Sequence, residues 1–301
     1  AVSVPDRVDA GCRGVDAVGF PVQVALSTMW LHLGDRDRSD ALLDVAAGDR
    51  RRGYWFYDCQ VLQREVMRHL LDGRWDEAEA AIEEIRRIGG HDPNLVLSCA
   101  QQESWLDRET GNVDRNLANI AVYRDLLPDF AAIRCIEIGE LAESGRLDEA
   151  RVALDEVAAD DFRGAGRGWV TLLSFANLAW AAVTLGADEY ATPLRRSLGP
   201  MAGQMAVITT GTNVMCSVDR LLAGLAALAG GHDESDALFA TALAQEQAVR
   251  SPPLEARTRH WWGRALERRG DTSAARPHLE RAADLAVALG MAGLEAQLTG
   301  R

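Results

Sequence analysis

The sequence predicts an all-α protein, a right-handed superhelix of about seven antiparallel helix pairs. Two nearly identical hexapeptides, GRWDEA at 73–78 and GRLDEA at 145–150, lie 72 residues apart. Looser copies recur along the chain with a spacing of 34 to 44 residues, and their leading glycines are Gly34, Gly73, Gly111, Gly145, Gly186, Gly230 and Gly270. Apolar residues before these glycines recur at three- and four-residue steps, the period of an α-helix. Regular spacing of this length is typical of helical repeats.

The hexapeptide predicts the turn between the two helices of each pair. Its glycine ends the first helix in the left-handed conformation, which costs other residues about 1–2 kcal/mol. Asp76 and Asp148 follow near the expected start of the second helix. A carboxylate there can accept free backbone N–H groups and interact with the positive end of the helix dipole.

A small residue stands five positions after most of these glycines and predicts close contact between the paired helices, because overpacking such a contact is costly. The small residues are Ser39, Ala78, Ala150, Ala191, Ser235 and Ala275. Larger apolar residues follow four positions later, namely Leu43, Ile82, Leu154, Phe239 and Leu279. Asn116 and Arg195 depart from this pattern in the third and fifth units.

Between the fifth and sixth units, VITTGTNV at 207–214 is expected to be a connector rather than a strand.

This pattern resembles the tetratricopeptide repeat, in which a small residue such as Gly263 is also frequent in the first helix. The segments LRRSLGPMAGQMAVITTGTNVMCSVDRLLAGLAALAGGHDESDALFATALAQEQ and LEARTRHWWGRALERRGDTSAARPHLERAADLAVALGMAGL further resemble the C-terminal helical region of large actinobacterial signalling regulators. Those regulators join an ATPase to such repeats, some with a nucleotide cyclase and some with a LuxR-type DNA-binding domain. The resemblance implies a binding and sensing module of a transcriptional or signalling regulator.

The chain is expected to form one repeat domain over 1–301, with an irregular segment at 1–19 and repeats over 20–301. It begins at Ala1 with a glycine-rich stretch, which favours a domain that belongs to a longer protein. A solenoid of this kind should be elongated, since each repeat contacts only its neighbours.

Composition excludes several functions and predicts a cytoplasmic protein. All 32 basic residues are arginine, so this segment has no P-loop lysine and no Schiff-base lysine. A net charge of −13 argues against direct nucleic-acid binding. No stretch has 18 consecutive apolar residues, and no signal peptide is recognisable. The cysteines are expected to be buried thiols, because no pair has metal-ligand spacing; they are Cys12, Cys59, Cys99, Cys135 and Cys216.

The sequence contains no recognisable catalytic, metal-binding or cofactor-binding motif, so we expect a binding protein rather than an enzyme. In stacked helix pairs the first helices line a concave groove. Projection of the tetratricopeptide register onto those helices gives the candidate partner-binding residues Gln60, Gln63, Gln101, Trp105, Arg108, Trp180, Arg220, Arg257, His260 and Arg264. Met67 and Cys135 fall on the same face.

Arg257, His260 and Arg264 share one helical face, because their spacing is i, i+3 and i+7. Guanidinium groups suit carboxylates and phosphates, so this stripe predicts an acidic or anionic ligand in the C-terminal part of the groove. Glu255 and Glu267 are close enough in sequence to neutralise it. The expected partner is a protein, a peptide or another domain of the parent regulator. A small-molecule-binding protein, or an enzyme with a cavity in the groove, is the alternative.

Overall fold

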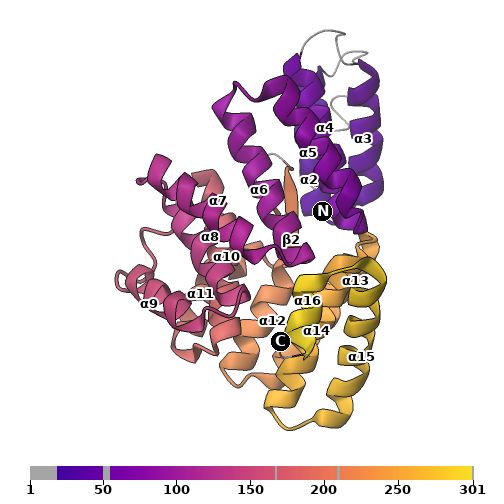
Figure 1. Cartoon of the computed structure of the whole chain (residues 1–301). Helices are drawn as coiled ribbons and strands as arrows, with labels where there is room; N and C mark the ends of the chain where they lie inside the picture. The colour runs from indigo at the N-terminus through magenta and orange to yellow at the C-terminus, as the bar shows by residue number, and fades with distance from the viewer. Residues whose placement is uncertain (1–18, 50–54, 167, 209–210, 300–301) are drawn as a thin grey trace.

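The computed structural model describes residues 19–49, 55–166, 168–208 and 211–299, and these residues are mainly helical (Figure 1). Residues 1–18, expected to be irregular, lie outside them, as does Cys12. The described helices form seven consecutive helix–turn–helix units: α2 (Phe20–His32) and α3 (Arg36–Asp49), α4 (Trp55–Asp72) and α5 (Trp75–Gly89), α6 (Pro93–Thr110) and α7 (Val113–Leu126), α8 (Ala131–Glu143) and α9 (Leu147–Ala158), α10 (Thr171–Leu185) and α11 (Ala191–Leu198), α12 (Val218–Leu228) and α13 (His232–Ala248), α14 (Pro252–Arg268) and α15 (Thr272–Leu289). The helix α16 (Ala292–Thr299) and the short 3-10 helices η1 (Gly168–Val170), η2 (Asp188–Tyr190) and η3 (Gly199–Met201) complete the helical elements. The prediction of an all-helical class is confirmed.

The repeated glycine has the predicted left-handed backbone in every unit. The φ angles of the seven glycines at 34, 73, 111, 145, 186, 230 and 270 are +76°, +73°, +79°, +78°, +69°, +79° and +87°. Asp76 and Asp148 lie inside the first turn of α5 and α9, after N-cap residues that make no side-chain cap. They therefore interact with the helix dipole and do not cap the helix.

The small residues at the helix contacts are buried as expected: Ser39, Ala78, Ala150, Ala191, Ser235 and Ala275 are each exposed by 2% or less. Ser235 Oγ donates a hydrogen bond of 2.9 Å to the Ala223 carbonyl, twelve residues earlier on the first helix. Asn116 makes the equivalent bond, from Nδ2 to the Ser104 carbonyl at 3.3 Å. The asparagine therefore fits this position because its amide is bonded to the paired helix.

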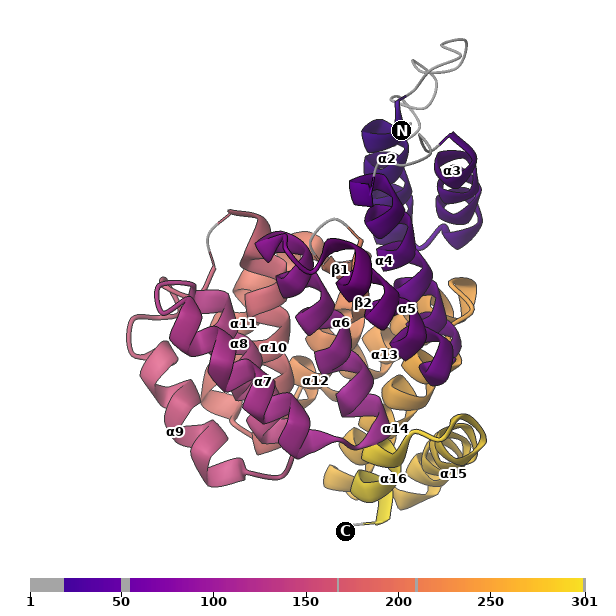
Figure 2. The same ribbon diagram turned by 45° about the horizontal axis from the view of Figure 1, so that its top comes forward.

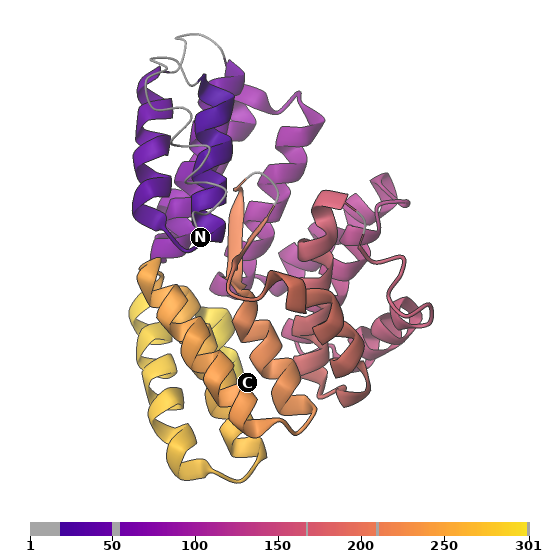
Figure 3. The ribbon, with the colours of Figure 1, turned by 180° about the vertical axis from the view of Figure 1, so that it is seen from behind.

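The expectation of a connector at 207–214 is wrong, because this region contributes to a β-hairpin. Strand β1 (Met205–Ile208) pairs antiparallel with β2 (Asn213–Ser217), and all residues of both strands are buried. Gln102 Nε2 donates 2.7 Å hydrogen bonds to the carbonyls of Thr212 and Gln63, which fixes the hairpin against α4 and α6. Figure 3 shows the hairpin between the N-terminal helices and α10. Its β-branched and apolar side chains fill the space between the first helices.

The first units of the chain contact the last ones, so the array closes on itself (Figure 2). Ser251 Oγ, at the start of α14, donates a 2.8 Å hydrogen bond to the Leu71 carbonyl at the end of α4. Trp75 Nε1 donates a 2.7 Å bond to the Leu289 carbonyl at the end of α15. An open, elongated solenoid does not have such contacts, because each unit then meets only its neighbours.

The accessible surface agrees with this closure. It measures 13440 Å², whereas a compact monomer of 32.7 kDa is expected to expose about 12,400 Å². The main apolar core runs from α2 to α14 without a break and includes residues of both strands. The expected elongated shape is therefore wrong. No helix among the described residues is long and apolar enough to span a membrane.

We predict that Gly293 is needed for this closure. A Cβ on Gly293 of α16 would lie 2.0 Å from the Arg108 carbonyl oxygen of α6, and backbone cannot yield as a flexible side chain does. Gly293→Ala should push α16 away from α6 and lower the free energy of unfolding by about 1–3 kcal/mol. Urea denaturation measures this change.

The control is Gly48→Ala in α3, where an added Cβ meets nothing within 4 Å. This substitution should be neutral or stabilise by up to about 1 kcal/mol, because glycine is unfavourable in a helix. Equal stability of the two variants would contradict the assigned contact between α16 and α6.

Candidate functional site

A cluster of aromatic and charged side chains lies where the first helices of the later units meet. Trp105 of α6 and Trp261 of α14 pack edge-to-face on Trp180 of α10, with ring centroids 6.3 and 5.0 Å from that of Trp180. Trp180 is fully buried. The guanidinium groups of three arginines lie 4.7, 5.0 and 5.4 Å from the Trp180 ring centroid; these arginines are Arg108, Arg220 and Arg257. Cation–π attraction is strongest at such desolvated sites.

Buried glutamates neutralise these arginines. Arg257 Nε lies 2.8 Å from Glu109 Oε1, and Arg257 Nη1 is paired with Glu143. Arg108 is bonded to Glu140, with 3.0 Å between Nε and Oε1. Because unpaired charge is costly in a low-dielectric interior, each of these pairs holds two helices together.

Arg220 is held differently from the other two arginines. Its Nη2 donates a 2.9 Å hydrogen bond to the Met215 carbonyl, and its Nε lies 3.9 Å from Glu246 Oε1. Glu246 also accepts hydrogen bonds from the Ser217 backbone N–H, at 3.0 Å, and from the Thr258 hydroxyl. Arg220 and Glu246 therefore join β2 and α12 to α13 and α14.

The pKa values in the cluster follow burial and these pairs. Burial by itself would raise the pKa of Glu143, but the charges of Arg257 and Arg108 lower it to about 2. Burial raises the pKa of Glu140 and of Glu246, against the opposing effects of Arg108 and Arg220. Burial likewise lowers the pKa of His260 to about 4. His260 is therefore neutral at pH 7.

Of the sequence-predicted residues, six come together in or beside this cluster: Trp105, Arg108, Trp180, Arg220, Arg257 and His260. The expectation that they line an open groove is wrong for Arg220 and Arg257, which are exposed by 0% and 1%. The array closes over them, and their charges are used in internal ion pairs. The suggestion that Glu255 neutralises the stripe is also wrong for Arg257, because Glu255 pairs with Arg259 at 2.7 Å.

Of the three predicted glutamines, Gln60 and Gln63 lie apart from the cluster, whereas Gln101 lines a cavity that cluster residues also line. Gln60 Oε1 and Gln63 Oε1 accept hydrogen bonds from Arg64 Nη1 at 2.7 and 3.3 Å. Gln60 lines a small cavity of ≈ 50 Å³ between α2, α3 and α4. Gln101 lines a different cavity, between α6 and the hairpin. Met67 and Cys135 are buried in the apolar core.

A cavity of ≈ 970 Å³ adjoins the cluster, and one of its walls is basic. His260, Arg264 and Arg268 lie on this wall, four residues apart along α14. Arg264 Nη1 is 2.7 Å from Glu267 Oε2, as the sequence suggested. Arg268 Nη1 donates a 3.3 Å hydrogen bond to the Val183 carbonyl, and among the described residues Arg268 has no carboxylate partner. Burial and the neighbouring Arg264 charge lower the pKa of Arg268.

The remaining walls of this cavity are partly polar and partly apolar, and come mainly from the turns of three units and from α16. The glycines Gly111, Gly145 and Gly186, with the C-terminal ends of α6, α8 and α10, form one side. Hydroxyl and amide groups of Thr110, Ser144, Thr184 and Gln297 face the same cavity. Backbone carbonyls at helix C-termini carry partial negative charge and accept hydrogen bonds. The cavity thus combines a cationic wall with a wall rich in acceptors.

Sequence reasoning missed Arg268, Glu109 and Glu143, yet the repeat contained a signal for all three. Each stands two residues before the glycine of its unit, at Gly270, Gly111 and Gly145. Thr184 occupies the same position before Gly186 and also lines the cavity. The described residues contain no group of three or more His, Cys, Asp or Glu side chains that could hold a metal ion.

A scan of the chain against protein-family models finds no match, and a search of curated proteins finds no related sequence.

We predict that loss of Arg257 destabilises the protein strongly. Arg257→Gln leaves Glu109 and Glu143 buried without their common cation, and an uncompensated buried charge costs about 3–5 kcal/mol. Arg259→Gln on the same helix is the matched control, expected to cost below about 1 kcal/mol because this pair is partly exposed. Urea unfolding compares the two.

The double variant Arg257→Gln, Glu109→Gln should recover part of the lost stability, since it removes one of the unpaired charges. If Arg257→Gln is no more destabilised than Arg259→Gln, the ion pairs do not hold the closed arrangement.

We also predict an acid-sensitive contribution from His260. Its pKa is about 4 in the folded protein and near 6.5 in the unfolded chain, so between these values the unfolded chain binds more protons. The contribution of neutral His260 to the free energy of unfolding is fully present above pH 6.5, and it falls by about 3 kcal/mol as the pH approaches 4. His260→Gln should remove this part of the pH dependence in urea unfolding between about pH 7 and pH 4.

The same replacement at the exposed His232 is the control and should leave the pH dependence unchanged. The Glu143 carboxylate also contributes to stability, and this contribution begins to be lost at the low end of the pH range. That loss affects every variant alike. A His260→Gln protein with the parent's pH dependence would refute the assignment.

Proposed function

We propose that this chain is a ligand-binding and sensing module, built as a tetratricopeptide-like superhelix that closes on itself. The module would belong to a larger cytoplasmic signalling or transcriptional regulator, the class of protein that the C-terminal part of the chain resembles. The left-handed glycine in every unit and the buried small residue in six of the seven described units support the repeat assignment. The cavity beside the Trp180 cluster is the proposed ligand site.

The proposed ligand is a small anion that carries hydroxyl or amino groups. The observation that carries this proposal is Arg268, a cation without a carboxylate partner among the described residues, next to Arg264 on the wall of a large cavity. A carboxylate or phosphate between the two guanidinium groups would form charge-assisted hydrogen bonds. Such bonds are typically worth about 1.5–3 kcal/mol each.

The opposite wall supports the second part of the proposal. Carbonyl groups at the ends of α6, α8 and α10 repel an anion but accept hydrogen bonds from hydroxyl or amino groups. Ser144 and Thr184 donate their hydroxyl hydrogens to the Leu141 and Trp180 carbonyls, so their oxygens and the amide oxygen of Gln297 add acceptors to this wall. A molecule with its anionic end toward α14 and its donors toward the turns would satisfy both walls.

The size and closure of the cavity favour a small molecule over a long peptide. A volume of ≈ 970 Å³ lies at the upper end of the range for small-molecule sites, about 300–1,000 Å³. The contacts of α4 with α14 and of α6 with α16 close the groove along which an extended peptide would lie. A partner protein could therefore place only a short acidic end in this cavity.

We predict that the anion site depends on Arg264 and Arg268. Glucose 6-phosphate, citrate and a tetraglutamate peptide are the anionic probes, and glucose is the uncharged one, with affinities measured by isothermal titration calorimetry. At least one anion should bind saturably and more weakly at higher salt, because the site is partly open to screening. Arg264→Gln with Arg268→Gln should weaken that binding at least tenfold, since tenfold corresponds to about 1.4 kcal/mol.

Arg276→Gln on the outer face of α15 is the matched control. It removes the same charge from an exposed side chain, 75% accessible, that lies outside the cavity. Absence of saturable binding by every anion, or equal loss in the Arg276→Gln control, would rule out the proposed site. Binding of tetraglutamate alone would assign the cavity to an acidic protein segment.

A further inference from the structure

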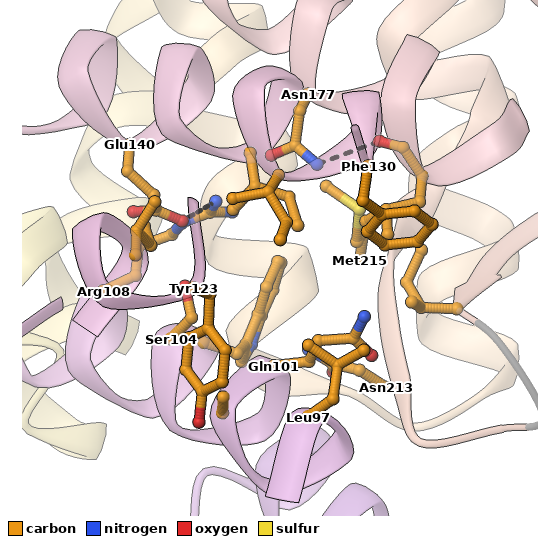
Figure 4. A pocket seen from close by; sticks show the side chains of 17 residues that line it. Leu97, Gln101, Ser104, Arg108, Tyr123, Phe130, Glu140, Asn177, Asn213 and Met215 are labelled. Carbon is orange, nitrogen blue, oxygen red and sulfur yellow. Dashed lines mark hydrogen bonds and ion pairs between the residues drawn. The ribbon is translucent and has the colours of Figure 1, made fainter. Parts of the chain in front are cut away.

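A second cavity, of ≈ 60 Å³, lies between α6, α7, α8, α10 and the hairpin (Figure 4). It shares the side chains of Arg108 and Glu140 with the large cavity and has no other lining residue in common with it. In Figure 4 the Arg108–Glu140 pair lies at one side, and Phe130 and Met215 lie at the other. The ion pair therefore separates two cavities of different character.

The walls of the second cavity are largely apolar. Branched aliphatic side chains come from five elements, and Trp105, Tyr123 and Phe130 supply three aromatic rings. The aliphatic residues are Leu97, Ile120, Ile133, Ile136, Leu173 and Ile208. Leu97, Tyr123 and Phe130 are only half-buried, so the cavity reaches the surface. A small apolar group can therefore enter without unfolding the surrounding helices.

Three residues that line this cavity each have a side-chain atom without a hydrogen-bond partner and with almost no accessible surface. These atoms are the amide oxygens Gln101 Oε1 and Asn177 Oδ1 and the guanidinium nitrogen Arg108 Nη1. Asn177 is 2% exposed, and its Nδ2 donates a 2.9 Å hydrogen bond to the Leu173 carbonyl. This bond identifies Nδ2 as the donor, so Oδ1 is the amide atom without a partner. Buried polar groups are normally satisfied in native proteins, and each exception requires an explanation.

We infer that this cavity is a second binding site, for a small uncharged molecule or group that has an apolar body and a carboxamide. Rotation of these three polar side chains toward the cavity would let the carboxamide N–H groups donate to Gln101 Oε1 or Asn177 Oδ1, and would let its carbonyl accept from Arg108 Nη1. The aliphatic and aromatic walls would cover the apolar body. This inference does not depend on the proposed anion site.

Charge and size define the ligand further. Arg108 is already paired with Glu140, so a charged ligand would enter an apolar site without a free counter-ion. A cavity of ≈ 60 Å³ holds about four to six water molecules, because one water needs about 10–15 Å³ on this measure. Four to six heavy atoms, as in a branched short-chain amide, match this volume.

The test uses isobutyramide as the probe and the indole N–H resonances of the ¹⁵N-labelled protein as the readout. Trp105 lines the cavity, whereas Trp75 lies at the α5–α15 contact and serves as the internal reference. Isobutyramide should shift the Trp105 resonance saturably and leave that of Trp75 unchanged. Methyl isobutyrate, which has no donor, and the isobutyrate anion should bind at least tenfold more weakly.

Substitutions then locate the site. Gln101→Leu and Asn177→Leu should each weaken isobutyramide binding at least tenfold, and Ala100→Leu should block it by filling the cavity. Gln247→Leu, an exposed position on α13, is the matched control and should retain the parent affinity. The Arg264→Gln, Arg268→Gln protein should also retain it, which separates this result from a failure of the anion site.

Three outcomes would overturn the inference. They are the lack of a saturable shift at Trp105, equal binding of the amide and the ester, and unchanged binding in the Ala100→Leu protein. Each of them would mean that only water satisfies the three polar atoms.

Discussion

The pairing of Arg257 with Glu109 and Glu143 is the constraint on which the closed arrangement depends. These ion pairs link α14 to α6 and α8 across 148 and 114 residues of chain. A single buried guanidinium without both carboxylates would be unfavourable, and so would the carboxylates without it. Closure of the array brings Arg257 together with Glu109 and Glu143. Each of these charges would be unfavourable in the same interior without its partner. Trp180, surrounded by three guanidinium groups, is the apolar centre around which these pairs are arranged.

Closure also explains why the described part of the chain encloses separate cavities rather than one groove. The hairpin occupies the N-terminal part of the interior, and its apolar side chains form part of the smaller cavity. The large cavity lies beside the turns, where helix ends leave carbonyl groups that must meet polar partners. Arg108 and Glu140 stand between the two. A ligand in either cavity would therefore contact the same ion pair.

The local part of this structure could be predicted from the sequence, because its causes are local. Gly73 and Gly145 end helices by backbone sterics, and Ala78 and Ala150 allow helices to approach. Closure could not be predicted in this way. Glu255 pairs with Arg259, which lies four residues on and on the same helical face, whereas Arg257 lies only two residues on and faces a different direction. Arg257 instead pairs with Glu109 and Glu143, which are distant in sequence. The hairpin was missed because its strands are stabilised by burial between helices.

The position two residues before each repeat glycine connects the repeat to the proposed function. It is occupied in order by His32, Leu71, Glu109, Glu143, Thr184, Leu228 and Arg268. At this position Glu109 and Glu143 bind Arg257 in the interior, whereas Thr184 and Arg268 are exposed and line the large cavity. Backbone geometry is fixed by the glycine that follows, so the side chain at this position can change without altering the turn. One repeated position can therefore provide closure in some units and ligand contacts in others.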